Sequence, residues 1–408
     1  MVTEKSILSS NFTNKLSPSV KEKVNEEIKR CSSTAEPAVE SAKCKSNEEK
    51  LYQESLALYK KLKQEGYYIH GDNGSDGNVK PKWFDQKLFD LGKHLGQKYF
   101  FSCFFGHLCG VYILVQIPSI YETLLTTGNS RTISTLFKRY LSTLNHVKSW
   151  YDGDVWDPKS PAYESVAAVR KIHKLVSKRV NEGRKEGVDK VAISQFDMFL
   201  TLWGFVGNTY LHPKETGFPD EPGNMKAWLH FWRVIGYLMG VDDKYNICDD
   251  DDMDRTGSMM QVVWDQEYKP LLINRDPSVE KGKIMCDSII ESMRAILPIL
   301  STPGFIKYFH EMHCVESPVE LETVGAKMGH RVLKLTMSKL LPSTIGEAIF
   351  NLLLIRSVNR CNANVAKIQK NLEGKGPINE ADSNFTSDSV NTNMNDTPSN
   401  LDPISSDC

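Results

Sequence analysis

The chain has 408 residues, enough for one large domain or two ordinary ones, and its 40% hydrophobic and 25% charged residues are normal for a globular protein. Its 50 lysines and arginines balance 51 aspartates and glutamates at a formal net charge of -1, which argues against a nucleic-acid-binding protein. The nine cysteines form no CxxC pair and no regular spacing, so we expect free thiols in a reducing compartment.

Both ends of the chain differ in composition from its middle. Residues 1–48 are rich in Ser, Lys and Glu, and residues 373–408 are rich in Asn, Ser, Asp and Thr. Such segments bury too little apolar surface to fold, so we expect two disordered tails around a folded domain at residues 49–372. Residues 1–30 lack the apolar core of a signal peptide, and we therefore expect an intracellular protein.

Apolar residues recur with a helical period along the whole predicted domain. The predicted helices are, in chain order, Glu49–Glu65, Lys82 to beyond Gly92, Tyr99–Thr126, Thr132–Trp150, Ser160–Asn181, Ser194–Leu211, Met225–Met239, Ser278–Leu297, Ile306–Cys314, Leu321–Lys339 and Ile345–Leu372. No run alternates between apolar and polar residues as a half-buried strand would. Helices joined by short loops predict an all-α domain.

The segment Tyr99–Ile120 is the most apolar part of the chain. It is long enough to cross a bilayer core of about 30 Å. It also contains His107 and Gln116 and lacks a flanking cluster of basic residues. These features favour a core helix of a large helical domain, and a peripheral association with a membrane stays open.

Polar side chains at helical spacing interrupt the apolar faces of two consecutive predicted helices. On the helix at 132–150 four residues share one face at i, i+4, i+7 and i+11. They are Arg139, Thr143, His146 and Trp150. On the helix at 160–181 a second face carries Arg170, His173 and Ser177. An imidazole on a rigid helix with apolar neighbours can bind iron, and a nearby arginine can bind anionic groups, but a lone histidine is more often an ordinary core or surface residue.

The spacing Arg139-x-x-x-Thr143, followed by Arg170-x-x-His173, resembles the paired signature of the rubber-oxygenase (latex-clearing protein)/mpaB oxygenase family. Three flanking segments are also similar to that family. They are Trp83-Phe84-Asp85 with Gly92, the apolar run FFGHLCGVYILVQIPSI, and FWRVIGYLMGV at 231–241. The resemblance covers about residues 80–345, which is most of the predicted domain.

The resemblance implies a globin-like helical core that holds haem b. It implies that His173 is the proximal iron ligand and that Arg139, Thr143 and Arg170 surround the haem, with Arg139 and Thr143 as catalytic residues. The activity it implies is a haem-dependent oxygenase reaction of dioxygen with a hydrophobic, unsaturated or isoprenoid substrate. We expect the protein in the cytoplasm or peripherally associated with a membrane such as that of the endoplasmic reticulum.

The chain departs from the family pattern at several positions. Ser142 stands where rubber oxygenases can place a distal lysine, and Ser177 stands where they carry another arginine. The acidic residue that those enzymes use as a base would fall near Thr123, so the adjacent Glu122 is our candidate for that role. These departures leave open an alternative, in which the chain is a non-catalytic haem- or lipid-binding interaction protein on the same fold.

We assign no catalytic role to the residues of three other sequence patterns. His310 and His313 lie three residues apart but lack a third ligand with suitable spacing, so we do not assign a metal site to them. The acidic run at 249–254 lacks the alternation of a calcium-binding loop and is expected to be a solvated loop. His94 and His107 flank the apolar segment and could line a substrate cavity, but we expect them in the core or at its boundary.

Overall fold

The structure, a computed structural model, describes residues 35–183, 190–273 and 277–374. The chain divides into two compact units, residues 1–55 and 56–408. The described part of the first unit is helical and forms the beginning of α2 (Ala35–Gly66), which therefore starts upstream of the predicted Glu49. The predicted tails at 1–34 and 375–408 lie outside the described residues, and the domain boundaries stay a prediction.

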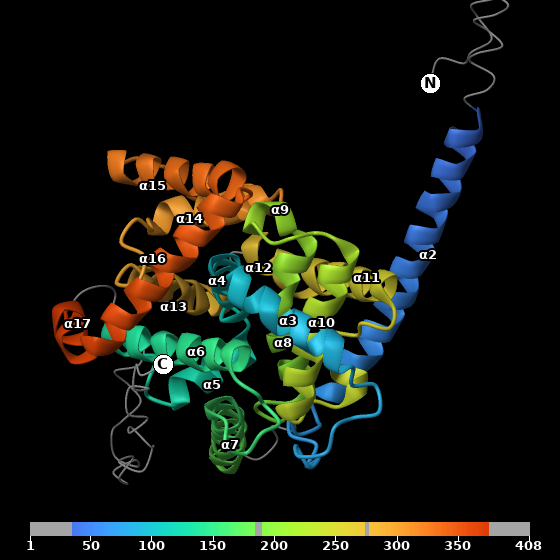
Figure 1. Cartoon of the computed structure of the whole chain (residues 1–408), viewed down its shortest axis with the longest axis horizontal. Coiled ribbons are helices and arrows are strands. Elements are labelled where there is room, and N and C mark those ends of the chain that lie inside the picture. Colours follow the sequence, from blue (N-terminus) through green and yellow to red (C-terminus); the bar gives the residue numbers. More distant parts are fainter. Residues whose placement is uncertain (1–34, 184–189, 274–276, 375–408) are drawn as a thin grey trace, which may run out of the picture. The chain divides into compact units, whose positions relative to one another are not determined.

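The second unit is built from helices (Figure 1). After α2 they are α3 (Gln86–Lys98), α4 (Phe100–Leu114), α5 (Pro118–Thr126), α6 (Ile133–Asp152), α7 (Pro161–Glu182), α8 (Gln195–Leu211), α9 (Pro213–Thr216), α10 (Pro222–Leu238), α11 (Met253–Val263), α12 (Lys269–Ile273), α13 (Pro277–Met293), α14 (Thr302–Met312), α15 (Val324–Leu335), α16 (Thr344–Ala363) and α17 (Val365–Leu372). Among the described residues the only β pairing is an isolated bridge between His70 and Ser194. The all-α prediction is confirmed.

The predicted helix Tyr99–Thr126 is wrong as a single element. It is broken into α4 and α5, whose axes differ by 98°. Pro118 is the first residue of α5, and a proline there can neither donate a backbone hydrogen bond nor continue the preceding helix without a clash. No single helix among the described residues has the length and apolar composition to cross a membrane, and α4 with α5 meets that test only as a bent pair.

Helix α4 lies in the core, as the interpretation of Tyr99–Ile120 as a core helix predicts. Every residue of α4 except Val111 is buried, and the helix packs lengthwise on α8. The two helices approach so closely that a Cβ added to Gly110 would lie 1.7 Å from the carbonyl oxygen of Gly204. A helix that is apolar on all sides belongs in such a crossing.

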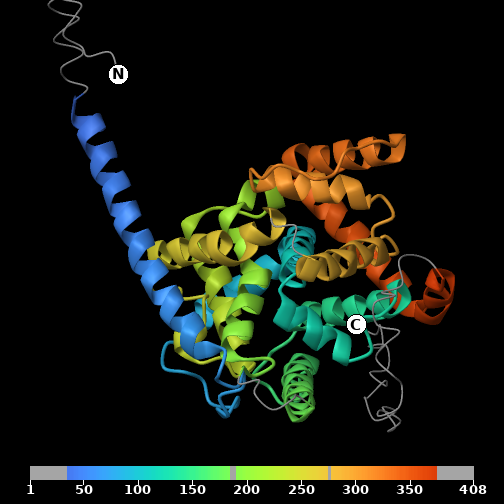
Figure 2. The ribbon, with the colours of Figure 1, turned by 180° about the vertical axis from the view of Figure 1, so that it is seen from behind.

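The helices α3 and α10 form a second close pair. A Cβ on Gly92 of α3 would lie 2.4 Å from the carbonyl oxygen of Ala227 in α10. On the next turn, Gly96 faces the ring of Tyr151 in α6, which connects the α3–α10 pair to α6. Helices α6 and α7, which carry the candidate site residues, contact each other and lie side by side in both ribbon views (Figures 1 and 2).

Most of the other predicted helices appear with shifted ends. The C-terminal pattern Ile345–Leu372 is interrupted at Asn364, which separates α16 from α17. The pattern Leu321–Lys339 becomes α15 followed by a π-helical turn at Thr336–Leu340. The sequence patterns predict no helix between residues 253 and 273, where the structure has α11, a second π-helical turn and α12.

Candidate functional site

The candidate residues lie on two neighbouring helices whose starts are set by the local sequence. Thr132 and Thr135 cap the first turn of α6 with a reciprocal pair of side-chain hydrogen bonds. Ser160 caps α7, and Pro161 follows as its first residue, where a missing N–H costs nothing. These signals fix where each helix begins and hence which residues face each other across the pair.

A polar bridge joins the C-terminal half of α6 to the start of α7. The Ser165 hydroxyl accepts a hydrogen bond from Trp150 Nε1 at 2.9 Å and lies 2.7 Å from His146 Nδ1. Burial lowers the pKa of His146, so its ring is neutral at pH 7 and one of its nitrogens is already engaged. We therefore assign His146 and Trp150, both on the predicted polar face of α6, to the packing of α7 on α6.

His173 has a different environment from His146. Its ring is half-buried, and the Nδ1 atom is fully buried with no hydrogen-bond partner among the described residues. Burial, together with the positive charge of Arg139, lowers the pKa of His173 to about 4. The imidazole is therefore neutral at pH 7 and has a lone pair or an N–H that the protein leaves unused, which is the state a metal ligand needs.

The guanidinium of Arg139 lies close enough to His173 to lower its pKa, although the two residues come from different helices. Its Nη1 donates to the hydroxyls of Thr127 at 2.9 Å and Ser130 at 3.1 Å, and it forms no ion pair with any described carboxylate. Burial lowers the pKa of Arg139, but an arginine keeps its charge in proteins. A half-buried cation without a counter-charge favours an anionic ligand.

Thr143 lies one turn after Arg139 on the same face of α6. Its hydroxyl is half-buried and donates to the carbonyl oxygen of Arg139 at 3.1 Å, within its own helix. This bond uses the hydroxyl proton and leaves the oxygen free to accept a further hydrogen bond. Of the three residues predicted from the sequence, Arg139 supplies a positive charge, Thr143 a hydrogen-bond acceptor and His173 a neutral imidazole.

Arg170 is engaged elsewhere. Its Nε and Nη2 each donate to a carboxylate oxygen of Asp72 at 2.7 Å, and Nη2 also donates to the carbonyl oxygen of Ser75 at 3.0 Å. The Arg170 guanidinium, with Lys174 nearby, holds the pKa of Asp72 at about 2. Arg170 therefore fastens the loop at 71–77 to α7, and sequence reasoning missed Asp72 because it lies 98 positions away along the chain.

The remaining sequence-predicted residues lie outside this cluster. Glu122 is exposed on α5, and the buried residue of that turn is Thr123, which donates to the carbonyl oxygen of Ser119 at 2.7 Å. Ser142 is exposed. Ser177 is buried and donates to the carbonyl oxygen of Ala192 at 2.7 Å, so it anchors the segment before α8 to α7.

His107, His310 and His313 are packed in the core, whereas His94 is exposed on α3, so the expected core or boundary position is wrong for His94. His107 is enclosed by the rings of Phe205 and Trp232, whose centroids lie 5.0 and 5.3 Å from its own. His313 stacks on Trp264 with a centroid separation of 3.7 Å, and His310 contacts the carbonyl oxygen of Ile306. Among the residues that the structure describes, no three His, Cys, Asp or Glu side chains are grouped to hold a metal ion.

The acidic run at 249–254 is only partly the solvated loop expected. Asp250 is buried, and its two oxygens contact Arg233 at 2.9 Å and His230 at 3.0 Å. Arg233 also contacts Asp249 and Asp251, and its guanidinium lies over the ring of Trp83. The solvated-loop prediction is wrong for Asp250, because its charge is neutralised by an arginine that the sequence pattern does not connect with it.

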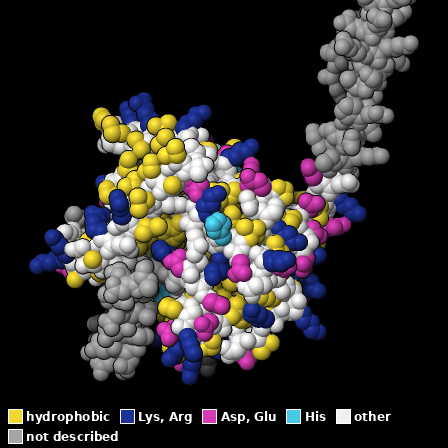
Figure 3. Space-filling model, in the orientation of Figure 1, with side chains coloured by type: hydrophobic (Ala, Val, Ile, Leu, Met, Phe, Trp, Pro, Cys, Tyr) yellow, Lys and Arg dark blue, Asp and Glu magenta, His cyan; other side chains and the backbone are white. Residues whose placement is uncertain are grey.

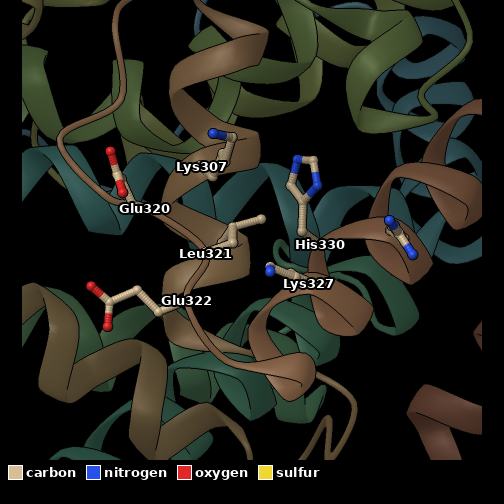
Figure 4. Close-up of a pocket in the computed structure, with 7 residues that line it drawn as sticks. Lys307, Glu320, Leu321, Glu322, Lys327 and His330 are labelled. Atoms are coloured by element: carbon tan, nitrogen blue, oxygen red, sulfur yellow. The ribbon is translucent and has the colours of Figure 1, made fainter.

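A surface cavity of about 590 Å³ lies away from α6 and α7, between α14 and α15 (Figure 4). Its lining residues are Lys307, Glu320, Leu321, Glu322, Lys327, His330 and Arg331. A wall with so many charges suits neither a porphyrin nor a hydrocarbon substrate, both of which bind in mainly apolar pockets. This cavity therefore does not bear on the candidate site at His173 and Arg139, which stays a prediction.

Comparisons with known proteins show the family to which the chain belongs. The family described as ER-bound oxygenase mpaB/B'/Rubber oxygenase, catalytic domain, matches residues 98–347, which is more than half of the chain and includes α6 and α7. The chain therefore belongs to this family. It is similar to the rubber oxygenase of Streptomyces sp. (strain K30), with 21% identity over 169 residues, which are 40% of this chain and 41% of that relative.

The match to the Streptomyces enzyme thus spans less than half of either protein. Among solved structures, the chain is similar to latex clearing protein LCP in the closed state, with a TM-score of 0.42 and 15% sequence identity. That alignment covers 76% of this chain and 89% of the other.

Proposed function

We propose that the chain is a haem-b-dependent oxygenase that uses dioxygen on a hydrophobic, unsaturated substrate of the isoprenoid type. The observation that carries the proposal is the pair formed by His173 and Arg139. Among the described residues, one is a neutral imidazole with an unused buried nitrogen, and the other is a guanidinium without a counter-charge. The family to which the chain belongs gives the pair its chemical context.

These residues fit a haem by the chemistry of their donors. His173 would supply the neutral nitrogen that binds the iron. Arg139 would hold anionic groups of the cofactor through charge-assisted hydrogen bonds. Thr143, whose oxygen is free to accept, would orient a proton donor beside Arg139. A bound haem would supply the redox chemistry with dioxygen, while the protein binds, orients and excludes water.

Arg170 and Glu122 have less direct roles in the proposed function than the family resemblance implies. Because Arg170 is bound to Asp72, we assign it to positioning α7 and with it His173, one turn further along the same helix. Glu122 stays a candidate base, and it would have to act from the exposed side of α5. A globin-like arrangement of the helices around the haem, and a peripheral location at a membrane from which an apolar substrate enters, also belong to the proposal.

The positions of Arg170 and Glu122 favour a second candidate function. Arg170 is bound to Asp72 and Glu122 is exposed, so neither would act on a substrate. The site would then bind haem or lipid without catalysing a reaction. Membership of a fold family does not by itself establish an activity. The alternative is therefore a non-catalytic haem- or lipid-binding interaction protein.

Oxygen consumption distinguishes the two functions. The haemin-loaded chain, supplied with ascorbate, is given squalene, an unsaturated isoprenoid, or squalane, its saturated counterpart. An oxygenase consumes oxygen with squalene and not with squalane, and Arg139→Gln slows it by about 100-fold, the usual effect of removing a charge-stabilising donor. Equal, slow consumption with both hydrocarbons and with the variant would contradict the enzyme and support the non-catalytic alternative.

A further inference from the structure

Helix α15 carries an apolar stripe that faces away from the protein. Val324, Met328 and Leu335 are 77%, 61% and 51% exposed, and they follow the i, i+4, i+11 spacing of one helical face. The opposite face contains the buried Ala326 and Gly329, which pack on α14 and the residues before it. The helix is therefore held from one side only, and its apolar stripe has no covering element among the described residues.

Helix α16 continues this pattern after the π-helical turn. Ile345, Ile349 and Leu353 are 75%, 50% and 54% exposed and lie at i, i+4 and i+8. Leu354 and Val358 on the other face are buried, and the helix packs on α4 and α6. We call these two exposed stripes together the α15–α16 surface.

A single exposed leucine is normal on a protein, but a group of exposed aliphatic side chains on consecutive helices indicates a binding surface. Figure 3 shows apolar side chains gathered in the region where Figure 1 places α15 and α16, with lysines and arginines around them. None of the exposed apolar residues of the two stripes is aromatic. Protein–protein interfaces are instead enriched in exposed aromatic residues.

The charge of this segment is unlike that of the rest of the chain. Residues 324–363 contain six lysines and arginines and a single carboxylate, Glu347, which is buried, whereas the whole chain has a net charge of -1. Four of the basic side chains are exposed and form no ion pair with described residues. They are Lys327, Arg331, Lys339 and Arg356. The surface thus offers unpaired positive charge next to exposed aliphatic side chains.

We propose that the α15–α16 surface docks on a lipid bilayer that contains anionic phospholipids. Amphipathic helices with aliphatic residues on one face and lysines or arginines beside it bind at the boundary between headgroups and acyl chains. Each basic residue near an anionic leaflet contributes about 1 kcal/mol, which is about fivefold in partitioning. The docking does not depend on the proposed oxygenase activity, although a bilayer is also where an isoprenoid substrate would dissolve.

Co-sedimentation of the full chain with vesicles tests the proposal. The vesicles are made of phosphatidylcholine alone or with about one third phosphatidylserine, at an ionic strength near 0.1 M, where charges interact over about 10 Å. We expect binding to the anionic vesicles that is at least tenfold stronger than binding to the neutral ones. The double variant Lys339→Gln/Arg356→Gln should weaken it by about 25-fold, at fivefold per charge.

The matched control is Lys60→Gln/Lys61→Gln, which removes two exposed lysines of α2 outside the surface and should leave binding unchanged. A third variant, Ile349→Ser/Leu353→Ser, removes the aliphatic contact and should also release the protein from the vesicles. Unaltered helical circular dichroism shows that each variant is folded. Equal loss in the Lys60/Lys61 control, or no binding by the folded wild type, overturns the proposal. So does a dimer in sedimentation velocity that only Ile349→Ser/Leu353→Ser dissociates, because the surface would then meet a second copy of the chain.

Discussion

The ion pair between Asp72 and Arg170 gives the most quantitative prediction about the candidate site, because it fastens the loop at 71–77 to the helix that carries His173. In Asp72→Asn the guanidinium loses its counter-charge but keeps its position. Both side chains are only 12–13% exposed, so water screens the pair weakly. We expect the variant to be less stable than the wild type at neutral pH. The shift in the pKa of Asp72 on folding gives the size of the lost free energy of unfolding.

The pKa of Asp72 falls from 3.8 to about 2 on folding, which corresponds to about 2.4 kcal/mol in favour of the ionised folded state. Because the pKa is lowered, this stability is present above pH 3.8 and is lost as the pH falls from 3.8 towards 2. Leaving Arg170 buried without a partner adds to the cost, and losses of about 3–5 kcal/mol occur when buried pairs are broken.

Urea unfolding at pH 7, followed by circular dichroism, measures the difference between the wild type and Asp72→Asn. The matched control is Asp220→Asn, which changes an exposed aspartate without an ion pair to the described residues. We expect a loss of about 2–4 kcal/mol for Asp72→Asn and less than about 0.5 kcal/mol for the control. Equal stabilities of the two variants would show that the loop is not held through Arg170.

Two further predictions concern the core and the candidate ligand. Gly110→Ala should cost about 3 kcal/mol or more in thermal unfolding, because its Cβ would lie 1.7 Å from the Gly204 carbonyl oxygen, whereas Gly223→Ala, with no atom within 4 Å, should be neutral. In the haem-free protein, the contribution of His173 to stability, up to about 3 kcal/mol, should be lost as the pH falls from 6.5 to about 4, because the lowered pKa of His173 favours proton uptake by the unfolded chain. His173→Gln should lose less over the same range, and identical urea-unfolding profiles for the two proteins would contradict the assignment.

The helical class and the pairing of the two signature helices could be predicted from the sequence, because amphipathic spacing and helix caps act over a few residues. The local signals include Thr132 before α6 and Ser160-Pro161 before α7. The break between α4 and α5 was not predicted, although Pro118 within the apolar run begins α5. The uniform hydrophobicity of Tyr99–Thr126 hid it, because a run that is buried on all sides has no polar face to mark its end.

Long-range pairing limited the prediction of the site. Arg139 and His173 lie on two helices that contact each other, and the charge of Arg139 contributes to the lowered pKa of His173, as two facing polar faces predict. The partner of Arg170 did not follow, because Asp72 comes from a loop before α3 and looks like any turn residue. Asp250 was misjudged for the same reason, since its buried partners His230 and Arg233 lie on α10. Helical periodicity predicts which face of a helix is buried, but it does not predict which charged side chain from another element will pair with that face.

Haemin titration followed by absorption spectroscopy tests the central claim most directly. We predict that the full chain takes up one haemin per molecule with a sharp Soret band. His173→Ala should lose this band while remaining folded, and the matched variant His94→Ala, at an exposed histidine of α3, should keep it. A folded wild type that takes up no haemin, or a His173→Ala variant with an unchanged Soret band, would contradict the assignment of His173 as the iron ligand.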